Sequence, residues 1–220
     1  MVSKPETSKK TRSAPRGRGR GSVGRDHIIT ATRGLLRRVP PSSLTRKLVA
    51  EEAGVDPALV RYYFSDLRHL LTEVLKVLVK DYGERFRALD IDPSSPEDAL
   101  KKRIRHLVTF LTEETSFHEL FIEQIINGHD EWALETRDWF TDQFFGTLSE
   151  IIETGRKDGL FRDDFDPRFL YLSIIGAGEF LATSRTIFTR LFGPDQTPND
   201  VADEFVEFLF QTLMQGIAKK

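Results

Sequence analysis

Residues 45–64 read TRKLVAEEAGVDPALVRYYF, and this stretch decides the fold. Its spacing predicts two short helices with a tight turn between them, because Gly54 can adopt the left-handed backbone that such a turn needs. Asp56 is a good N-cap for the second helix, and Pro57 suits the first helical position because its missing N–H would be unpaired there. The small side chain of Ala50 lets the two helices cross closely. We interpret the stretch as a helix-turn-helix, whose second helix enters the major groove of DNA.

The chain reads as helical on both sides of this motif. From Arg25 onward no stretch alternates apolar and polar residues for long enough to predict a sheet. Three further dipeptides, Ser95-Pro96, Asp166-Pro167 and Thr197-Pro198, repeat the pairing of a capping residue with proline, and each predicts a helix start. We therefore expect an all-α protein of about nine helices, at residues 25–39, 46–53, 57–63, 66–89, 96–113, 116–127, 130–157, 167–191 and 198–218.

Charge divides the chain into a basic front and an acidic body. The formal net charge is only -2, but residues 1–25 carry +7, residues 26–80 carry +3 and residues 81–220 carry -12. Such an asymmetry predicts that the basic front binds a polyanion and that the acidic body has a different role. We expect three parts, which are a disordered basic arm at 1–24, a helix-turn-helix DNA-binding domain at 25–65 and a helical domain at 66–220.

The composition excludes several classes of protein. The chain has no Cys, which excludes a disulfide framework, a Cys-ligated zinc site and a thiol nucleophile. No apolar run approaches the ~18 residues of a membrane span, and the basic N-terminus lacks the apolar segment of a secretory signal. We expect a cytoplasmic protein without a membrane segment.

The sequence lacks the patterns of catalytic and metal sites. His106, His118 and His129 do not stand at the i and i+4 spacing of a helical metal site, and no His-Glu-x-x-His occurs. No serine motif resembles a nucleophile elbow, and no Gly-rich loop follows a strand. We expect no metal, no cofactor and no enzymatic activity, and a helical enzyme remains the less favoured alternative.

Residues 45–71 resemble the TetR family of transcriptional regulators, chiefly in Ala53-Gly54-Val55 and in Tyr62-Tyr63-Phe64-Ser65. The resemblance implies a homodimeric DNA-binding regulator, most often a repressor. It also implies a three-helix head that carries the helix-turn-helix and a C-terminal domain that dimerises and binds a ligand. The chain departs from the family at Leu67, where a Lys usually holds a phosphate, and we expect Arg68 to take over that contact.

The resemblance also implies which side chains meet DNA. Those implied at base edges offer apolar contact, for example to a thymine methyl group, and they are Pro57, Ala58 and Leu59. Those implied at phosphates or flanking bases are Arg61, Tyr62 and Tyr63. Those implied at the sugar–phosphate backbone, where a helix N-terminus also favours phosphate, are Thr45, Arg46 and Lys47. A core position is the alternative for Tyr62 and the expectation for Phe64.

The basic arm alternates arginine with glycine at Arg16, Arg18 and Arg20. An extended Arg-Gly strand is narrow enough for a minor groove about 6 Å wide, especially in A·T-rich DNA. The arm has few apolar residues to offset its ordering entropy, so we expect it to be disordered without a partner. Two alternatives stay open: a tail that is only nonspecifically basic, and a ligand-independent architectural or nucleoid-type DNA-binding protein.

The last two predicted helices are apolar over more than one face, which indicates helices buried on two sides. The resemblance implies that they form a four-helix bundle with their twofold mates. A dimer whose two DNA-binding domains are related by a twofold axis predicts an operator that is an inverted repeat. The candidate interface residues are Phe169, Ile175, Gly178, Phe180, Phe205, Phe208, Leu209 and Leu213.

The resemblance further implies a cavity for a small apolar or aromatic ligand inside the helical domain. The candidate lining residues are His106, Phe110, Phe117, Phe121, Gln124, Asn127, Trp132, Trp139 and Phe140. Among them His106, Gln124 and Asn127 are the polar points that a pocket needs to orient its ligand. An ordinary core position is the alternative for each. The helix at 66–89 joins both domains. We therefore expect a tilt of this helix to transmit ligand binding to the two DNA-binding domains of the dimer.

Overall fold

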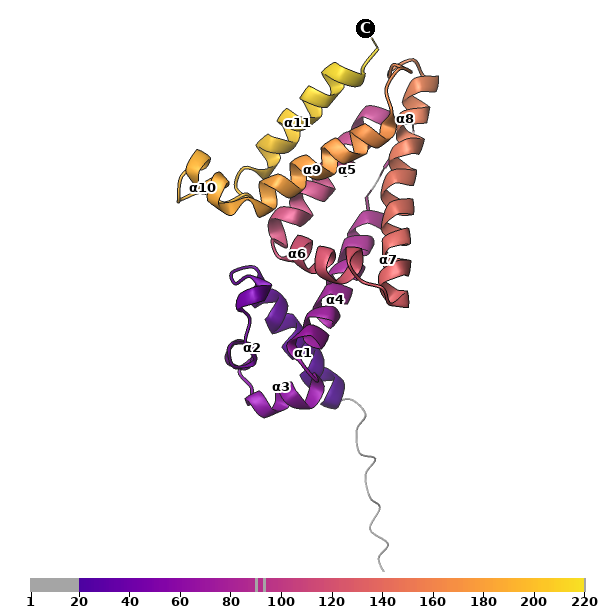
Figure 1. Cartoon of the computed structure of the whole chain (residues 1–220). Coiled ribbons are helices and arrows are strands. Elements are labelled where there is room, and N and C mark those ends of the chain that lie inside the picture. The colour runs from indigo at the N-terminus through magenta and orange to yellow at the C-terminus, as the bar shows by residue number, and fades with distance from the viewer. Residues whose placement is uncertain (1–19, 90, 93, 220) are drawn as a thin grey trace, which may run out of the picture.

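The computed structural model describes residues 20–89, 91–92 and 94–219. Within these ranges the chain is helical, and the β-type contact is an isolated antiparallel bridge between Phe161 and Ala218. The structure therefore confirms the predicted all-α class. Figure 1 shows the helix-turn-helix segment at one end of the molecule and the C-terminus at the other.

The N-terminal head consists of α1 (Arg20–Leu36), α2 (Arg46–Ala53) and α3 (Pro57–Tyr63), with a short 3-10 turn at Pro41–Ser43. The helices α2 and α3 have the predicted bounds. The helix α1 begins at Arg20, ahead of the predicted start at residue 25. Residues before 25 show little apolar periodicity, but extending an existing helix is far easier than nucleating a new one.

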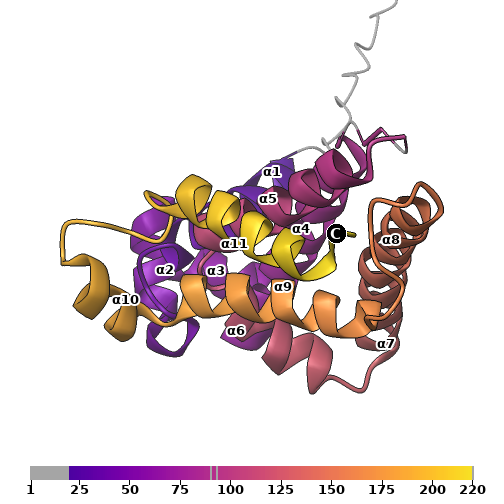
Figure 2. The same ribbon diagram turned by 90° about the horizontal axis from the view of Figure 1, so that it is seen from above.

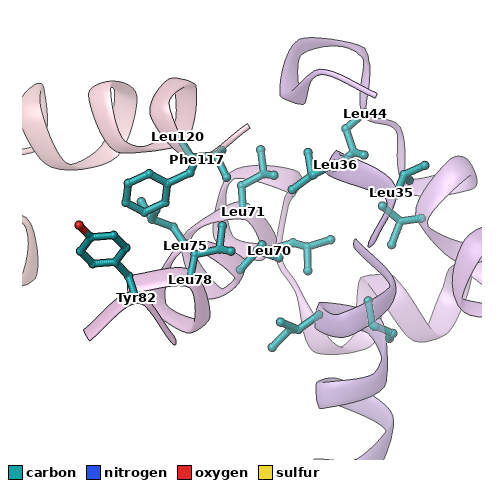
Figure 3. Packing of buried hydrophobic residues seen from close by; sticks show 14 of the residues in the cluster. Leu35, Leu36, Leu44, Leu70, Leu71, Leu75, Leu78, Tyr82, Phe117 and Leu120 are labelled. Atoms are coloured by element: carbon teal, nitrogen blue, oxygen red, sulfur yellow. The ribbon is translucent and has the colours of Figure 1, made fainter. Parts of the chain in front are cut away.

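The helix α4 (Leu67–Arg87) connects the head to the body. Its inward leucines belong to one core that includes both parts. Figure 3 shows Leu71 and Leu75 of this helix between Leu36 of the head and Phe117 of the body. Because packed interiors transmit small displacements, a change of packing in the body can reach the head through this core.

The body follows as seven further helices: α5 (Pro96–Glu113), α6 (Phe117–Phe121), α7 (Glu131–Thr141), α8 (Thr147–Lys157), α9 (Pro167–Thr183), α10 (Arg185–Phe192) and α11 (Ala202–Ile217). The helix α5 is central, because it packs against α8, α9 and α11. Figure 2 shows α9 and α11 side by side on one side of the body. A second hydrophobic core lies between these four helices.

The body departs from the predicted helices at three places. One-turn π-helical segments lie at Ile122–Ile126 and at Asp142–Gly146, and the second interrupts the predicted helix 130–157. The predicted helix 167–191 is divided at Ser184 into α9 and α10. Apolar spacing is helical on both sides of each interruption, so periodicity alone does not show where the backbone changes.

In three of the four predicted pairs of a capping residue and a proline, the proline stands at the first helical position. These prolines are Pro57, Pro96 and Pro167. The prediction for Pro198 was wrong, because α11 begins at Ala202. The carboxylate of Asp200 accepts hydrogen bonds from the N–H and the hydroxyl of Thr197, both at 2.7 Å. These bonds close a turn ahead of the helix, where short polar side chains compete with helical backbone bonds.

Candidate DNA-binding surface and ligand cavity

The helix-turn-helix is held by two side-chain caps, of which the sequence predicted the one at Asp56. The hydroxyl of Thr45 accepts the N–H of Leu48 at 3.2 Å and caps α2. Gly54 has φ 62° and ψ 34°, which is the left-handed conformation expected in the turn. The carboxylate of Asp56 accepts the N–H of Ala58 at 2.7 Å and caps α3. The motif is therefore built as its residue types indicate.

Four of the residues implied at DNA lie on the exposed side of α3: Pro57, Ala58, Arg61 and Tyr62. The Tyr62 side chain is 79% exposed, which excludes the alternative of a core position. Leu59 and Tyr63 are half-buried. A Cβ on Gly24 would lie 3.1 Å from the Tyr63 hydroxyl oxygen, so this glycine lets α1 approach the tyrosine closely. Phe64 is 1% exposed and is a core residue, as expected.

The start of α2 offers one anchored and one exposed cation. Arg46 is half-buried, and its Nη2 donates to the carbonyl of Ser65 at 2.7 Å. This bond ties α2 to the turn between α3 and α4. Lys47 is exposed, with its Nζ 3.7 Å from the Glu51 carboxylate. Exposed pairs of this kind are weak, so Lys47 can exchange its carboxylate partner for a phosphate.

The basic arm lies mostly beyond the described residues. Arg16 and Arg18 are outside them, so their interpretation as minor-groove residues stays a prediction. Arg20 is the first residue of α1. Its backbone is helical, which does not fit the extended strand that was predicted at this position.

Arg68 lies on the exposed side of α4, beside a hollow of ≈ 150 Å³ under the connection between α6 and α7. The walls of this hollow include Gln124, Asn127 and Trp132, which were predicted to line the ligand cavity. They do not line the aromatic cavity described next, and their role in ligand binding stays a prediction. The π-helical turn at Ile122–Ile126 contains an extra residue, which changes the direction of the side chains relative to a regular helix.

An aromatic cavity of ≈ 150 Å³ lies in the body between α4, α5, α6, α7 and α9. Four residues that were predicted to line a cavity do so: Phe110, Phe117, Phe121 and Phe140. The wall residues from α4 and α9 were not predicted, and they include Tyr82, Tyr171 and Ile175. Tyr82 is 2% exposed and stands on the inward stripe of α4, so periodicity could have selected it.

Two charged side chains in the wall of this aromatic cavity were also missed, and both are held by protein groups. The Nη2 of Arg137 donates to the carbonyls of Ile125 at 3.0 Å and Gly128 at 2.9 Å. The carboxylate of Glu179 is paired with the His118 ring. These contacts fix the connection between α6 and α7 and join α6 to α9.

A smaller cavity of ≈ 30 Å³ adjoins the aromatic cavity, and Tyr82 and Tyr171 line both. It contains two polar residues of α5, Arg103 and His106. Burial lowers the pKa of His106 to about 4, so this side chain is neutral at pH 7. The sequence predicted His106 as a polar point of the ligand site, and the structure places it in this adjoining space.

Trp139 is half-buried against the core around α4 and does not line either cavity, so the structure does not support its predicted role. A Cβ on Gly83 would lie 3.0 Å from the indole Cη2, which shows that the glycine leaves room for the ring. The Trp139 ring also meets Phe140 edge-on, with 5.0 Å between ring centres. Its side chain therefore fills the gap between α4 and α7.

The helices α9 and α11 leave large apolar side chains uncovered. The side chains of Phe169 and Phe180 on α9 are 70% and 57% exposed, and that of Phe208 on α11 is 67% exposed. All three were predicted at the dimer interface. Leu172 is 61% exposed and was not selected from the sequence. An uncovered apolar face of this kind marks an interaction surface.

The other predicted interface residues are turned toward the interior. Gly178 is buried against α5, Leu209 is 9% exposed, and Ile175 lines both cavities, so burial within one chain does not favour their assignment to the interface, which stays a prediction. Phe205 and Leu213 are half-buried against the second core. Both helices are apolar on more than one face, so the sequence could not tell the outer face from the inner one.

Two further findings concern membrane-spanning helices and metal sites. In the part of the chain that the structure describes, no helix is both long and apolar enough to cross a membrane. No group of three or more His, Asp or Glu side chains in that part is arranged to hold a metal ion.

The helix α3 is exposed, α4 shares one hydrophobic core with the head and the body, and the body contains a cavity. Together these features define a DNA-binding transcriptional regulator. The family model described as "Tetracyclin repressor-like, C-terminal domain" matches residues 96–213, which is more than half of the chain. The chain therefore belongs to the TetR family of transcriptional regulators.

Known proteins resemble the chain over most of its length. The HTH-type transcriptional repressor NicS of Pseudomonas putida is 22% identical over 200 residues, covering 89% of this chain and 92% of NicS. The ketosteroid transcriptional regulator KstR2 of Mycobacterium tuberculosis has a TM-score of 0.65 at 14% identity, over 95% of this chain and 100% of KstR2. AibR, in complex with isovaleryl coenzyme A and operator DNA, has a TM-score of 0.59 at 18% identity, over 85% and 98% of the two chains. The two structures show a shared fold.

Proposed function

We propose that the protein is a homodimeric repressor that binds an inverted-repeat operator through α2 and α3. A small molecule in the aromatic cavity would release it. The observation that supports this most is the single core that joins the open reading head to the cavity wall. Phe117 is both a wall residue of the cavity and a neighbour of Leu71 and Leu75 on α4. A binding protein without catalytic groups suits this arrangement, and such a regulator acts in the cytoplasm, where its operator is.

Two connections would carry the signal from the cavity to the head. One is α4, whose first half packs in the head and whose second half supplies Tyr82 to the cavity. The other is the turn between α5 and α6, where Glu114 binds Arg33 of α1 and Arg37 just after that helix. Filling the cavity would displace both connections and change the distance between two heads that must span about one DNA turn, roughly 34 Å.

The alternative of a ligand-independent architectural protein is less well supported, because such a protein needs no cavity in its body. Selection of binding sites from random DNA, followed by footprinting, separates the two. A repressor should protect one short palindrome. Broad protection of A·T-rich DNA would contradict the proposal.

Replacing Arg61 by alanine should weaken operator binding about fivefold to tenfold, or ~1 kcal/mol, because it removes an exposed cation from the outer side of α3. The slope of log K against log salt should become shallower by about one, as expected for one lost phosphate contact. Fluorescence anisotropy at several salt concentrations measures both. Arg190→Ala, on exposed α10, is the matched control and should change neither. An unchanged slope in Arg61→Ala would remove this residue from the DNA surface.

Replacing Phe208 by arginine should weaken self-association about thirtyfold or more, because a central aromatic contact of an interface contributes ~2 kcal/mol or more. Sedimentation velocity over a concentration series measures the change. Leu134→Arg is a suitable control, since Leu134 is 46% exposed but lies on α7, away from the proposed interface. A dimer that survives Phe208→Arg with unchanged affinity would place the interface elsewhere.

A further inference from the structure

Arg103 is a buried cation without an ion-pair partner in the described part of the chain. Its side chain is 9% exposed, and its Nη2 donates to the carbonyl of Phe144 at 2.9 Å. Its other terminal nitrogen, Nη1, is buried and has no hydrogen-bond partner among the described groups. Glu150 acts on it electrostatically, but from beyond ion-pair distance. The guanidinium therefore has one free donor group and an uncompensated charge.

The environment of Arg103 only partly offsets its buried charge. The guanidinium carbon lies 4.6 Å from the centre of the Phe86 ring and 5.8 Å from that of Phe144, which are cation–π contacts. Burial lowers the pKa of Arg103 to about 10, so it is still protonated at pH 7. A water molecule could accept from Nη1, but it would not neutralise the charge. A buried cation is stabilised best by an anion, and the chain does not supply one at this position.

His106 adds a second unpaired polar atom to the same space. It stands one helical turn after Arg103 on α5, and its Nε2 is buried without a hydrogen-bond partner. Its ring centre lies 4.6 Å from that of Tyr82. Tyr82 and Tyr171 line both this small cavity and the aromatic cavity, so the two spaces adjoin. A ring in the larger cavity could therefore place one polar substituent in the smaller one.

We propose that the ligand is a small monocarboxylic acid with one aromatic ring, bound with its ring in the aromatic cavity and its carboxylate on Nη1 of Arg103. This proposal rests on the proposed function, because it names the chemical class of the effector. The larger cavity, at ≈ 150 Å³, matches the size of engineered apolar cavities that hold benzene. Neutral His106 lies beside the carboxylate and does not repel it.

Arg137 is the other guanidinium in the wall of the aromatic cavity, and it is the competing anchor. Its Nη2 donates to two carbonyl oxygens, whereas that of Arg103 donates to one, although Nε of Arg137 is also buried without a hydrogen-bond partner. The carboxylate of Glu179 also lies in the wall of the same cavity and would repel a ligand carboxylate there. The geometry therefore favours Arg103.

The test is isothermal titration calorimetry of the full-length protein with benzoate, benzyl alcohol and benzylamine. Benzoate should bind at least tenfold more tightly than the neutral and the cationic compound. Arg103→Met keeps the length and apolar body of the side chain, and replacing a buried charge by a hydrophobic residue is often neutral or stabilising, so this variant should fold. It should lose the preference for benzoate and bind benzyl alcohol at least as well as before. Arg137→Lys, which keeps the positive charge, should retain the preference.

Three results would overturn the proposal. They are equal binding of benzoate and benzyl alcohol by the unmodified protein, a preference for benzoate that persists in Arg103→Met, and a preference that is lost in Arg137→Lys. Thermal unfolding of each variant separates lost binding from lost folding. The repressor function has an independent readout, which is sequence-specific operator binding without any ligand, so the two proposals can fail separately.

Discussion

Replacing Glu114 by alanine should lower the free energy of unfolding by about 3 kcal/mol, because it removes a buried carboxylate that binds half-buried Arg33 and exposed Arg37. The Glu114 side chain is 3% exposed, and its Oε1 accepts from Nη2 of Arg33 at 2.7 Å and of Arg37 at 2.6 Å. Arg33 is on α1, Arg37 directly follows its last residue, and Glu114 follows α5, so this contact joins the head to the body. Urea unfolding followed by circular dichroism measures the loss.

The Glu114 contact is reinforced by its neighbours. Nη2 of Arg33 also donates to the carboxylate of Asp81 on α4 at 2.6 Å. Burial would raise the pKa of Asp81, but the hydrogen bond and charge of Arg33 outweigh it and hold that pKa below its usual range. The hydroxyl of Ser116 donates to the carbonyl of Leu36 at 2.6 Å. The turn between α5 and α6 is therefore bonded to α1 and, through Arg33, to α4.

Glu113 provides the matched control for Glu114. It is the preceding residue on α5, but its side chain is 36% exposed and its ion pair is with Arg85 of the body. Glu113→Ala should cost less than about 1 kcal/mol, as exposed pairs do. Glu114→Gln should fall between the two alanine variants, because the amide keeps one acceptor but loses the charge. Equal losses in Glu113→Ala and Glu114→Ala would show that the contact between head and body contributes little stability.

The sequence predicted best those features whose cause lies within a few residues. The cap at Asp56 and the turn at Gly54 depend on neighbours in the chain, and both predictions were confirmed. The core position of Phe64 was also confirmed. The same locality explains the failure at Pro198. There Asp200 closes a competing local turn that the cap-proline pattern does not distinguish from a helix start.

The candidate ligand site was only half predictable, because its walls come from distant parts of the chain. Aromatic spacing selected Phe110 and Phe117 correctly. Nothing near Arg103 in the sequence shows that its guanidinium is buried, because an Arg on a helix normally extends its head into solvent. The inserted residue of the π-helical turn at Ile122–Ile126 directed Gln124 away from the aromatic cavity. Outer and inner faces of α9 could be separated only once α5 was in place.

Replacing Gly155 by alanine should lower the free energy of unfolding by about 3 kcal/mol, although alanine is normally favoured over glycine in a helix by ~1 kcal/mol. A Cβ at this position would lie 2.2 Å from Cδ2 and 2.4 Å from Cε2 of the Phe161 ring. The ring cannot easily move aside, because Phe161 is 1% exposed. The N–H groups of Leu160 and Phe161 also donate to the Gly155 carbonyl at 2.8 Å and 3.0 Å, which holds the chain against α8.

Gly146→Ala tests whether the loss at Gly155 comes from steric overlap or from glycine itself. A Cβ on Gly146 meets no atom within 4 Å, and its φ of −56° and ψ of −55° suit alanine. This variant should be unchanged or more stable by up to ~1 kcal/mol, so the two substitutions should have opposite signs. Urea unfolding of both variants gives the comparison. If Gly155→Ala were as stable as the unmodified protein, Phe161 would not be seated on α8. The antiparallel bridge between Phe161 and Ala218 joins the connection before α9 to the end of α11. Phe161 would then no longer be held in position for this bridge.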